Sequence, residues 1–413
     1  MRRRRGTAGT RRGRNSSGER VAIEYIDTPI GLADACARAA ASAAYALDTE
    51  FHRERTYFPK LALLQLHWEE DGRGVNVLID PLVIEREDLA ASVRALLAAP
   101  ATALMHAPQQ DLEILELLTG LRPSRLFDCQ LAAGFLGYST PSLGTLAQST
   151  IGVNLAKGER LTDWLARPLT DAQHLYAIND VVHLPAIESS LTRQLESRGR
   201  LPWALEACES MRTRPLPGGD PQHAWMRIKE VRTLKGEALG AAQEIAAWRD
   251  LRARKLDIPV RRVLSDMALV SIAQRLPRGV RDLERVRGVN PGQIHADMHE
   301  ALIEAVERGR SRVQEPRRGQ RGNGRHTRTS ATVLNAWVAE VAHREQIDPM
   351  LVATRDDVEE FLERGPAALP EGWRRELVGK DFQRLVDGRA GLVLDANGHL
   401  DLVELPGRGT TAR

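Results

Sequence analysis

The sequence predicts an α/β domain with a mixed sheet, followed by one or two all-helical domains. Short apolar stretches suited to strands open the first domain, helical periodicity alternates with them from residue 89 onwards, and strand patterns become rare beyond Pro202. A length of 413 residues accommodates about two or three domains, and 42% hydrophobic with 27% charged residues is typical of a folded globular protein.

The first domain is expected to open with strands joined by short turns. Strands are expected at residues 43–51, 61–66, 75–79 and 101–106. The sequence Asp71-Gly72-Arg73-Gly74 predicts a hairpin turn before the third of them. Helices are expected at residues 89–97 and from Asp111 onwards, where leucines recur at helical spacing. Strands that alternate with helices indicate a mixed sheet.

The remainder of the chain is predicted to be mainly helical. Prolines and glycines in residues 211–222 indicate a linker. Residues 225–306 show helical spacing and no convincing strand, so a helical bundle is expected there. Residues 331–385 have helical spacing again, and Asn397-Gly398 predicts a terminal hairpin between 392–394 and 400–403.

The net charge of +3 hides strong segregation. Residues 2–20 and residues 308–328 each hold eight arginines and a single acidic residue, in contexts rich in glycine, serine and threonine. Such segments are expected to be flexible and to bind phosphate backbones, although they also serve as solubilising tails. Residues 21–205 hold 15 basic and 23 acidic residues, a charge of −8, which suits a domain that holds divalent cations.

Several classes of protein are excluded by composition. No apolar run approaches the roughly 18 residues that a membrane span needs, and no apolar stretch follows the arginine-rich N-terminus as in a secretory signal. Cys36, Cys129 and Cys208 are far apart and form no CxxC pair, so neither a disulfide framework nor a structural zinc site is expected. A cytoplasmic protein fits these features.

Acidic residues occur in three short motifs. Asp48 and Glu50 are two apart on an expected strand, so both face one side, as either a cation site or a solvated strand end. Asp111 stands where a helix begins, where a capping aspartate is an adequate alternative. Tyr176 and Asp180 are four apart on one helix face, as either site residues or a buried polar pair.

The three motifs carry more weight together than singly. The helix of the third motif is expected to begin at a capping box formed by Thr170 and Gln173. Together the motifs supply four carboxylates and a phenol. Such a set suits two hard divalent cations with oxygen ligands, which is what phosphodiester cleavage needs.

The motifs resemble those of the Tyr-containing branch of the DEDD exonuclease superfamily. Residues 47–61 and 163–169 narrow the resemblance to the ribonuclease D family, over about residues 21–205. Residues 258–264, followed by Asp266, are similar to an HRDC domain. The resemblance implies a ribonuclease H-like exonuclease domain followed by one or two HRDC-type bundles. The resemblance and the composition together divide the chain into a disordered arginine-rich arm (1–20), the exonuclease domain (21–205), a linker (206–218), an HRDC domain (219–307), an arginine-rich flexible linker (308–329), a second HRDC-like domain (330–406) and a tail (407–413). The arginine-rich arm and the arginine-rich linker depart from the family pattern.

The resemblance also implies an activity, a metal-dependent 3′–5′ exoribonuclease that releases nucleoside 5′-monophosphates and trims tRNA precursors. By this resemblance Asp48, Glu50, Asp111 and Asp180 hold two Mg²⁺ or Mn²⁺ ions. Tyr176 would orient the attacking water, because a phenol with a pKa of about 10 is a poor base. The expected partner is RNA, with DNA as the alternative, and a monomer that does not bind a membrane is expected. The rival functions are a DNA exonuclease and a non-catalytic nucleic-acid-binding protein with a nuclease-like fold.

Four residues are candidates for contact with nucleic acid. Phe51 would stack on the last base, with a core aromatic as the alternative. Lys157 would contact phosphate, although a surface lysine is the default. Arg261 and Arg262 belong to a basic cluster of the expected HRDC domain.

Overall fold

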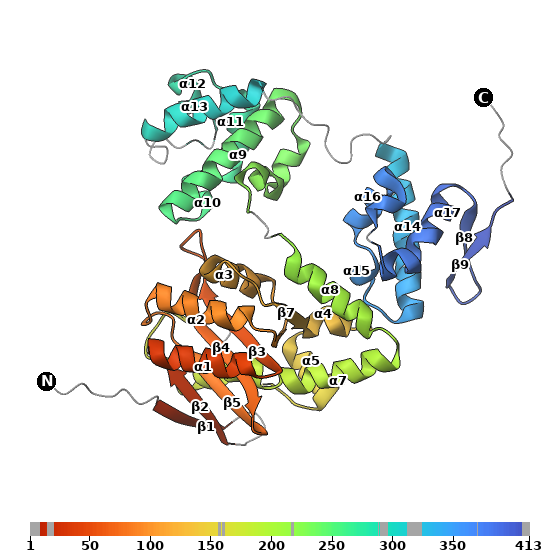
Figure 1. The fold of residues 1–413 in the computed structure, drawn as a ribbon. Coiled ribbons are helices and arrows are strands. Elements are labelled where there is room, and N and C mark those ends of the chain that lie inside the picture. Colours follow the sequence, from red (N-terminus) through yellow and green to blue (C-terminus); the bar gives the residue numbers. More distant parts are fainter. Residues whose placement is uncertain are drawn as a thin grey trace.

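The chain forms three units, shown in Figure 1. The computed structural model describes residues 9–14, 20–155, 158, 162–215, 219–287, 289, 296–311, 324–369 and 371–406. We call the units the sheet domain (residues 9–215), the middle domain (219–311) and the C-terminal unit (324–406). In this described part of the chain, no helix combines the length and the apolar character that crossing a membrane requires.

The sheet domain contains a seven-stranded sheet in the order β1-β2-β5-β4-β3-β6-β7. Its strands are β1 (Gly9–Arg14), β2 (Arg20–Ile26), β3 (Ala44–His52), β4 (Lys60–Glu70), β5 (Arg73–Ile79), β6 (Thr102–Met105) and β7 (Arg125–Asp128). Strand β4 pairs antiparallel with β3 and β5, whereas β6 pairs parallel with β3 and β7. The sheet is therefore mixed, as predicted, and all four predicted strands are present.

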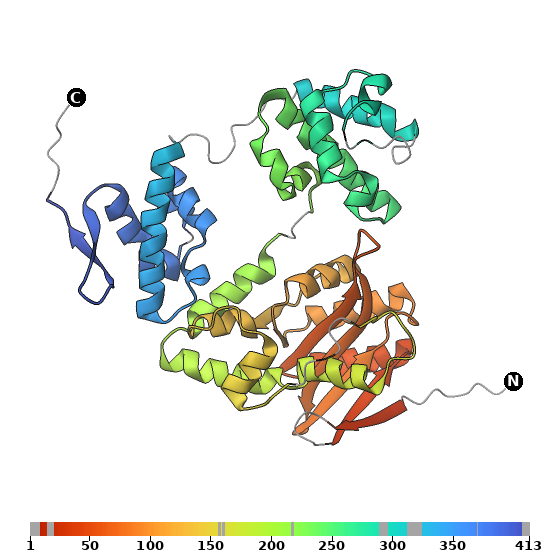
Figure 2. The same ribbon diagram turned by 180° about the vertical axis from the view of Figure 1, so that it is seen from behind.

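Helices cover both faces of the sheet. On one face, α1 (Pro29–Ala41), α2 (Arg86–Ala98) and α3 (Gln109–Thr119) share an apolar cluster with Leu47 and Leu64. On the other face, seen from behind in Figure 2, α6 (Asp171–Val182) shares a different cluster with Ala46 and Leu63. Side chains of a strand alternate between faces, so the even-numbered residues of β3 face α6.

Further helices complete the sheet domain: α4 (Cys129–Gly134), α5 (Leu143–Ile151), α7 (Leu184–Ser197) and α8 (Leu201–Thr213). Helix α8 corrects the predicted boundary at residue 205, since eight residues of the expected linker are helical. Ala207 and Cys208 explain the extension, because both are buried and belong to the helix that packs on β7 and α4.

The arginine-rich segments are also more structured than predicted. Residues 9–14 of the expected flexible arm form β1, which pairs antiparallel with β2. Backbone groups make this pairing, so an edge strand can form without an apolar sequence pattern. The expected linker at 308–329 is shorter, because one helix ends at Ser311 and the next begins at Gly324. The tail at 407–413 lies outside the described residues.

The described part of the middle domain contains helices and no strand. Its elements are η2 (Pro221–Arg227), η3 (Lys229–Thr233), α9 (Gly236–Leu256), α10 (Val260–Val263), α11 (Asp266–Arg275), α12 (Val280–Glu284) and α13 (Ala296–Ser311). Helices α9 and α13 approach closely where Gly240 meets Gly309. A Cβ atom on Gly240 would lie 2.1 Å from the Gly309 carbonyl oxygen, so this crossing requires glycine.

The C-terminal unit shares its apolar core with the sheet domain. Its elements are α14 (Gly324–Glu345), α15 (Pro349–Val352), α16 (Arg355–Arg364), η4 (Gly365–Ala368), η5 (Arg375–Gly379), α17 (Lys380–Val386), β8 (Ala390–Leu394) and β9 (Leu400–Glu404). Strands β8 and β9 form the predicted terminal hairpin. Trp373 stacks on Trp203 of α8 with ring centroids 5.5 Å apart. Arg200 bonds Glu345 at 2.9 Å, so the two units are joined by both apolar and ionic contacts.

Candidate active site

Strand β3 delivers two carboxylates to the face of the sheet covered by α6. Asp48 and Glu50 follow Ala46 at a spacing of two, so the alternation that points Ala46 into this face points them the same way. A β-bulge follows, since Glu50 pairs with Leu63 but Phe51 pairs with Leu61. The extra residue, Ala62, has a carbonyl that accepts a hydrogen bond from Arg167 at 2.6 Å.

Helix α6 brings a third carboxylate over the strands. The helix begins at the predicted capping box, with Thr170 and Gln173 bonding each other's backbone N–H groups. It packs on β4, β5 and β3 through buried residues such as Ala177 and Ile178. Asp180, one turn beyond Tyr176, thereby reaches the carboxylates of β3.

The carboxylates of Asp48, Glu50 and Asp180 converge. One oxygen of each lies within 4.8 Å of the others. Burial, together with the charges of Asp111, Asp180 and Glu50, raises the pKa of Asp48 well above its usual range. Burial and the charge of Asp111 raise the pKa of Asp180 to about 7. Crowded carboxylates of this kind are suited to a divalent cation, which would remove their mutual repulsion.

Asp111 belongs to the same acidic group without joining that 4.8 Å set. It is the third residue of α3, whose N-cap is Pro108, so the alternative of a capping aspartate is wrong. Its Oδ1 accepts a short hydrogen bond from the hydroxyl of Thr49, which lies between the two acidic residues of β3. Burial raises the pKa of Asp111 to about 6. The sequence analysis missed Thr49, because nothing local links residues 49 and 111.

A second network that the sequence analysis missed holds the segment leading into α6. Asp80 accepts from Arg167 Nε at 2.6 Å, from Arg167 Nη2 at 2.9 Å and from the Tyr25 hydroxyl at 2.7 Å. Burial alone would raise the pKa of Asp80, but these hydrogen bonds outweigh it and lower the pKa. Trp164, in the same segment, lies against Tyr176 with ring centroids 6.0 Å apart. The network therefore fixes the approach to the helix that carries Tyr176 and Asp180.

The four residues predicted to contact nucleic acid lie in different parts of the structure. Phe51 lies next to the acidic group, half-buried, with the Arg53 guanidinium 5.5 Å from its ring centroid, and it belongs to none of the three apolar clusters. Arg261 and Arg262 are exposed on α10 of the middle domain, and Arg261 pairs with Asp266 at 3.1 Å. Lys157 lies outside the described residues.

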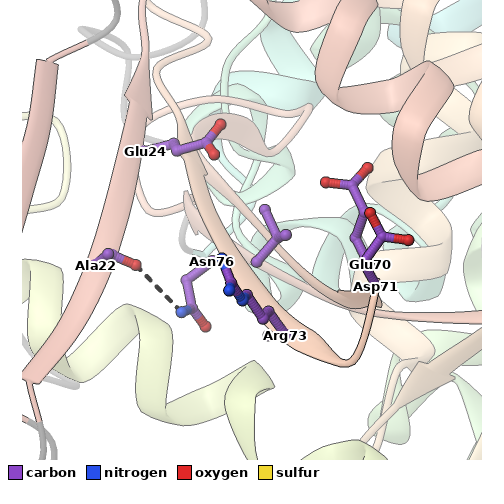
Figure 3. A pocket seen from close by; sticks show the side chains of 8 residues that line it. Ala22, Glu24, Glu70, Asp71, Arg73 and Asn76 are labelled. Atoms are coloured by element: carbon purple, nitrogen blue, oxygen red, sulfur yellow. Dashed lines mark hydrogen bonds between the residues drawn. The ribbon is translucent and has the colours of Figure 1, made fainter.

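A separate pocket of about 530 Å³ lies at the β4–β5 hairpin, and Figure 3 shows the polar side chains that line it. Glu70 at its edge is five residues along β4 from Gln65, the register partner of Asp48, which is about 17 Å of strand. Arg38 bonds both Glu24 and Glu70, at 3.3 Å and 2.8 Å. These two acids are therefore neutralised within the protein.

The fold and the acidic group can now be compared with known proteins. Residues 23–196 match a family model described as a 3′–5′ exonuclease, and residues 238–306 match that of the HRDC domain. A ribonuclease D of Acidiphilium cryptum (strain JF-5) is 34% identical over 391 residues, covering 92% of this chain and 97% of the relative. The chain belongs to the ribonuclease D family. A ribonuclease D of Gluconacetobacter diazotrophicus is 33% identical over 356 residues, covering 84% and 89%.

A solved ribonuclease D structure agrees. The crystal structure of Escherichia coli RNase D, described as an exoribonuclease involved in structured RNA processing, has a TM-score of 0.78 to this chain. The two are 31% identical, over 89% of this chain and 99% of that one. The predicted family and fold class are confirmed, and family membership makes this chain a hydrolytic 3′–5′ exoribonuclease.

Proposed function

We propose that this exoribonuclease cleaves RNA with two divalent cations, Mg²⁺ or Mn²⁺, held by Asp48, Glu50, Asp111 and Asp180. The single observation that carries the proposal is the convergence of the Asp48, Glu50 and Asp180 oxygens within 4.8 Å. The donor set fits the ions, because hard cations prefer carboxylate oxygens, and burial beside the charge of Asp111 raises the pKa of Asp180, so that a cation would favour its ionised form. Asp111, whose charge acts on Asp48 and Asp180, completes the set.

The residues of the chain have separate tasks in this proposal. Bound cations supply an activated water and stabilise the charge on the departing 3′ oxygen. Tyr176 orients the water through its hydroxyl, and Trp164 and the Arg167–Asp80 pair hold the helix that carries it. Phe51 stacks on the terminal base, with Arg53 covering its other side. The product is a nucleoside 5′-monophosphate.

We infer that the substrate is an RNA with a structured body and a 3′ end to be trimmed, such as a tRNA precursor. The Escherichia coli relative is described as acting in structured RNA processing, which supports this choice. The middle domain would bind RNA as an HRDC domain, with Arg261 and Arg262 on its exposed surface. The C-terminal unit remains a proposed second HRDC-like domain.

The test is a cleavage assay on purified protein, with labelled RNA and Mg²⁺ or Mn²⁺, with and without EDTA. Asp48→Ala is expected to lower the rate by about a hundredfold or more, since it removes a ligand of the proposed cations. Asp171→Asn is the matched control, because this carboxylate lies on α6, like Asp180, but is fully exposed. Activity that survives EDTA, or a loss of less than about tenfold in Asp48→Ala, would contradict the proposed mechanism.

The same assay tests whether RNA or DNA is the preferred substrate. Matched oligonucleotides that differ only in the 2′-hydroxyl should be degraded at different rates, with RNA faster by at least about tenfold. Equal rates would favour a nuclease that does not select the sugar. Wild-type protein that degrades neither would favour the non-catalytic alternative.

A further inference from the structure

The β3–β4 loop, residues 53–59, reaches from the candidate active site to the middle domain. It follows β3, the strand of Asp48 and Glu50, almost directly. In both views the loop extends from the sheet towards the end of α9 and α10 (Figures 1 and 2). Its residues therefore lie between the acidic group and the domain that matches HRDC.

Tyr57 in this loop inserts into the middle domain. Its hydroxyl lies 3.1 Å from both carboxylate oxygens of Asp250 and accepts a hydrogen bond from Arg254 Nε at 2.9 Å. The Arg254 guanidinium lies 5.4 Å from the centroid of the tyrosine ring, and the ring packs against the apolar core of the middle domain. Asp250 is only 1% exposed, so this contact uses a buried charge.

The backbone of the loop is held as well. Asp257 ends α9 and accepts from the N–H groups of Tyr57 and Phe58, both at 3.1 Å. Asp257 is the C-cap of α9, and its backbone is in the left-handed region with φ 48°. We call Tyr57, Asp250, Arg254 and Asp257 the Tyr57 clasp.

The other end of the loop contacts the elements of the acidic site. Arg53 pairs with Glu113 at 2.7 Å, and Glu113 is two residues beyond Asp111 on α3. The same guanidinium lies over the ring of Phe51. The loop is thus anchored to both β3 and α3 at one end and to the middle domain at the other.

The charges of the two domains make this connection important for binding a polyanion. Residues 21–205, which make up most of the sheet domain, carry −8, so this part repels a polyanion outside the proposed cation site. Arg252 and Lys255 on α9 and Arg261 and Arg262 on α10 lie at the end of the middle domain that the clasp holds. A strand longer than a few nucleotides therefore gains phosphate contacts from this end only while the end stays beside the site.

We propose that Tyr57 is a positioning residue that selects long RNA, because its clasp holds the basic end of the middle domain at the mouth of the acidic site. The inference rests on the exonuclease mechanism proposed above. A long RNA contacts both domains at once, whereas a short oligoribonucleotide needs the sheet domain alone. When the clasp is released, the middle domain is no longer held beside the acidic site. An RNA bound to the sheet domain then meets the middle domain at a lower effective concentration.

Two variants of the full chain test the clasp. Tyr57→Phe keeps the ring and removes the hydroxyl, and Asp257→Gly removes the carboxylate at a position where glycine adopts the observed φ without strain. Loss of a hydrogen bond to a charged group changes the equilibrium constant for docking by about tenfold. We expect Kd for a long RNA in EDTA, and KM in Mg²⁺, to rise by about threefold to tenfold in each variant, because the change in the docking constant sets the upper limit. The values of kcat and KM on a short oligoribonucleotide should change less than twofold. Tryptic cleavage after Arg55, followed by mass spectrometry, should accelerate about tenfold, since the loop is freed.

Matched controls are Tyr138→Phe, which removes a hydroxyl away from the clasp, and Glu237→Gln, which removes an exposed carboxylate at the other end of α9. Both should behave as wild type. If cleavage after Arg55 became faster while Kd for the long RNA stayed unchanged, the proposed link between the clasp and RNA binding would be overturned. Equal losses of activity on short and long RNA would assign Tyr57 to the folding of the site. If wild-type protein cleaved neither RNA, the exonuclease mechanism would fail, while the Kd comparison in EDTA would still decide the role of the clasp.

Discussion

Replacing Asp180 by asparagine is expected to stabilise the metal-free protein while it removes activity. Burial and the charge of Asp111 raise the pKa of Asp180 from 3.8 to about 7. The folded protein therefore binds this proton more tightly than the unfolded chain does. Between about pH 4 and pH 7 the contribution of Asp180 to the free energy of unfolding falls as the pH rises, and above pH 7 the full cost of the ionised group is present. Asparagine has the same shape and carries no charge.

The size of the gain follows from the shift. A pKa raised by about 3 corresponds to about 4 kcal/mol of lost stability for the ionised group. This value is the upper limit of the gain in Asp180→Asn, because the asparagine amide still needs hydrogen-bond partners. Half of that limit, about 2 kcal/mol, is a reasonable expectation at pH 8. For a unit of about 200 residues, such a gain raises Tm by about 4–8 °C.

The assay is thermal unfolding in EDTA at pH 8 and at pH 5, measured by differential scanning calorimetry. Asp180→Asn should melt higher than wild type at pH 8 but not at pH 5, where Asp180 already carries its proton. Mg²⁺ should raise Tm of wild type at pH 8 and leave the variant unchanged. Asp171→Asn, on the exposed side of the same helix, should not show this pattern. A lower Tm of Asp180→Asn at pH 8, or an equal gain at both pH values, would refute the reasoning.

Three further predictions follow from the same geometry. Protons on Asp111 and Asp180, whose pKa values are raised to about 6 and about 7, compete with cations for the carboxylates. The affinity for Mn²⁺, measured by titration calorimetry, should therefore fall at least about tenfold from pH 8 to pH 6. An unchanged affinity would contradict this prediction. Tyr176→Phe should keep the Mg²⁺-induced rise in Tm but lose about tenfold or more in kcat, and normal turnover would remove its proposed role. Arg167→Ala leaves Asp80 buried without its main partner, so urea unfolding should show a loss of about 3 kcal/mol, and a loss below 1 kcal/mol would show that the pair is dispensable.

The parts of the fold that could be predicted from sequence are those written in local periodicity. The spacing of two between Asp48 and Glu50 placed them on one face of a strand, and the structure shows that the neighbouring Ala46 faces α6. The capping box at Thr170 and Gln173 fixed the start of α6 within one residue. A turn of four then places Tyr176 and Asp180 on one side of that helix. The same local signals predicted the terminal hairpin.

What could not be predicted depends on contacts between distant segments. Thr49 bonds Asp111 across 62 residues, Asp80 bonds Arg167 across 87, and Tyr57 bonds Asp250 across 193. No spacing rule links such pairs, because their geometry is set by the packed sheet and helices rather than by neighbours in the chain. The edge strand β1 was missed for a related reason, since backbone groups of β2 template it.

The placement of arginines explains how an acidic site can remain able to bind cations. Arg167 lies beside the α6 segment, yet its guanidinium forms two hydrogen bonds with Asp80 and thus neutralises a carboxylate outside the acidic group. Arg53, next to Phe51, is likewise paired with Glu113. If either arginine instead paired with Asp180, its pKa would fall below its usual range and the carboxylate would no longer need a cation. The raised pKa of Asp180 shows the opposite state. Attraction for the RNA chain must then come from bound cations and from basic residues beyond the site, which is where the Tyr57 clasp holds the basic end of the middle domain.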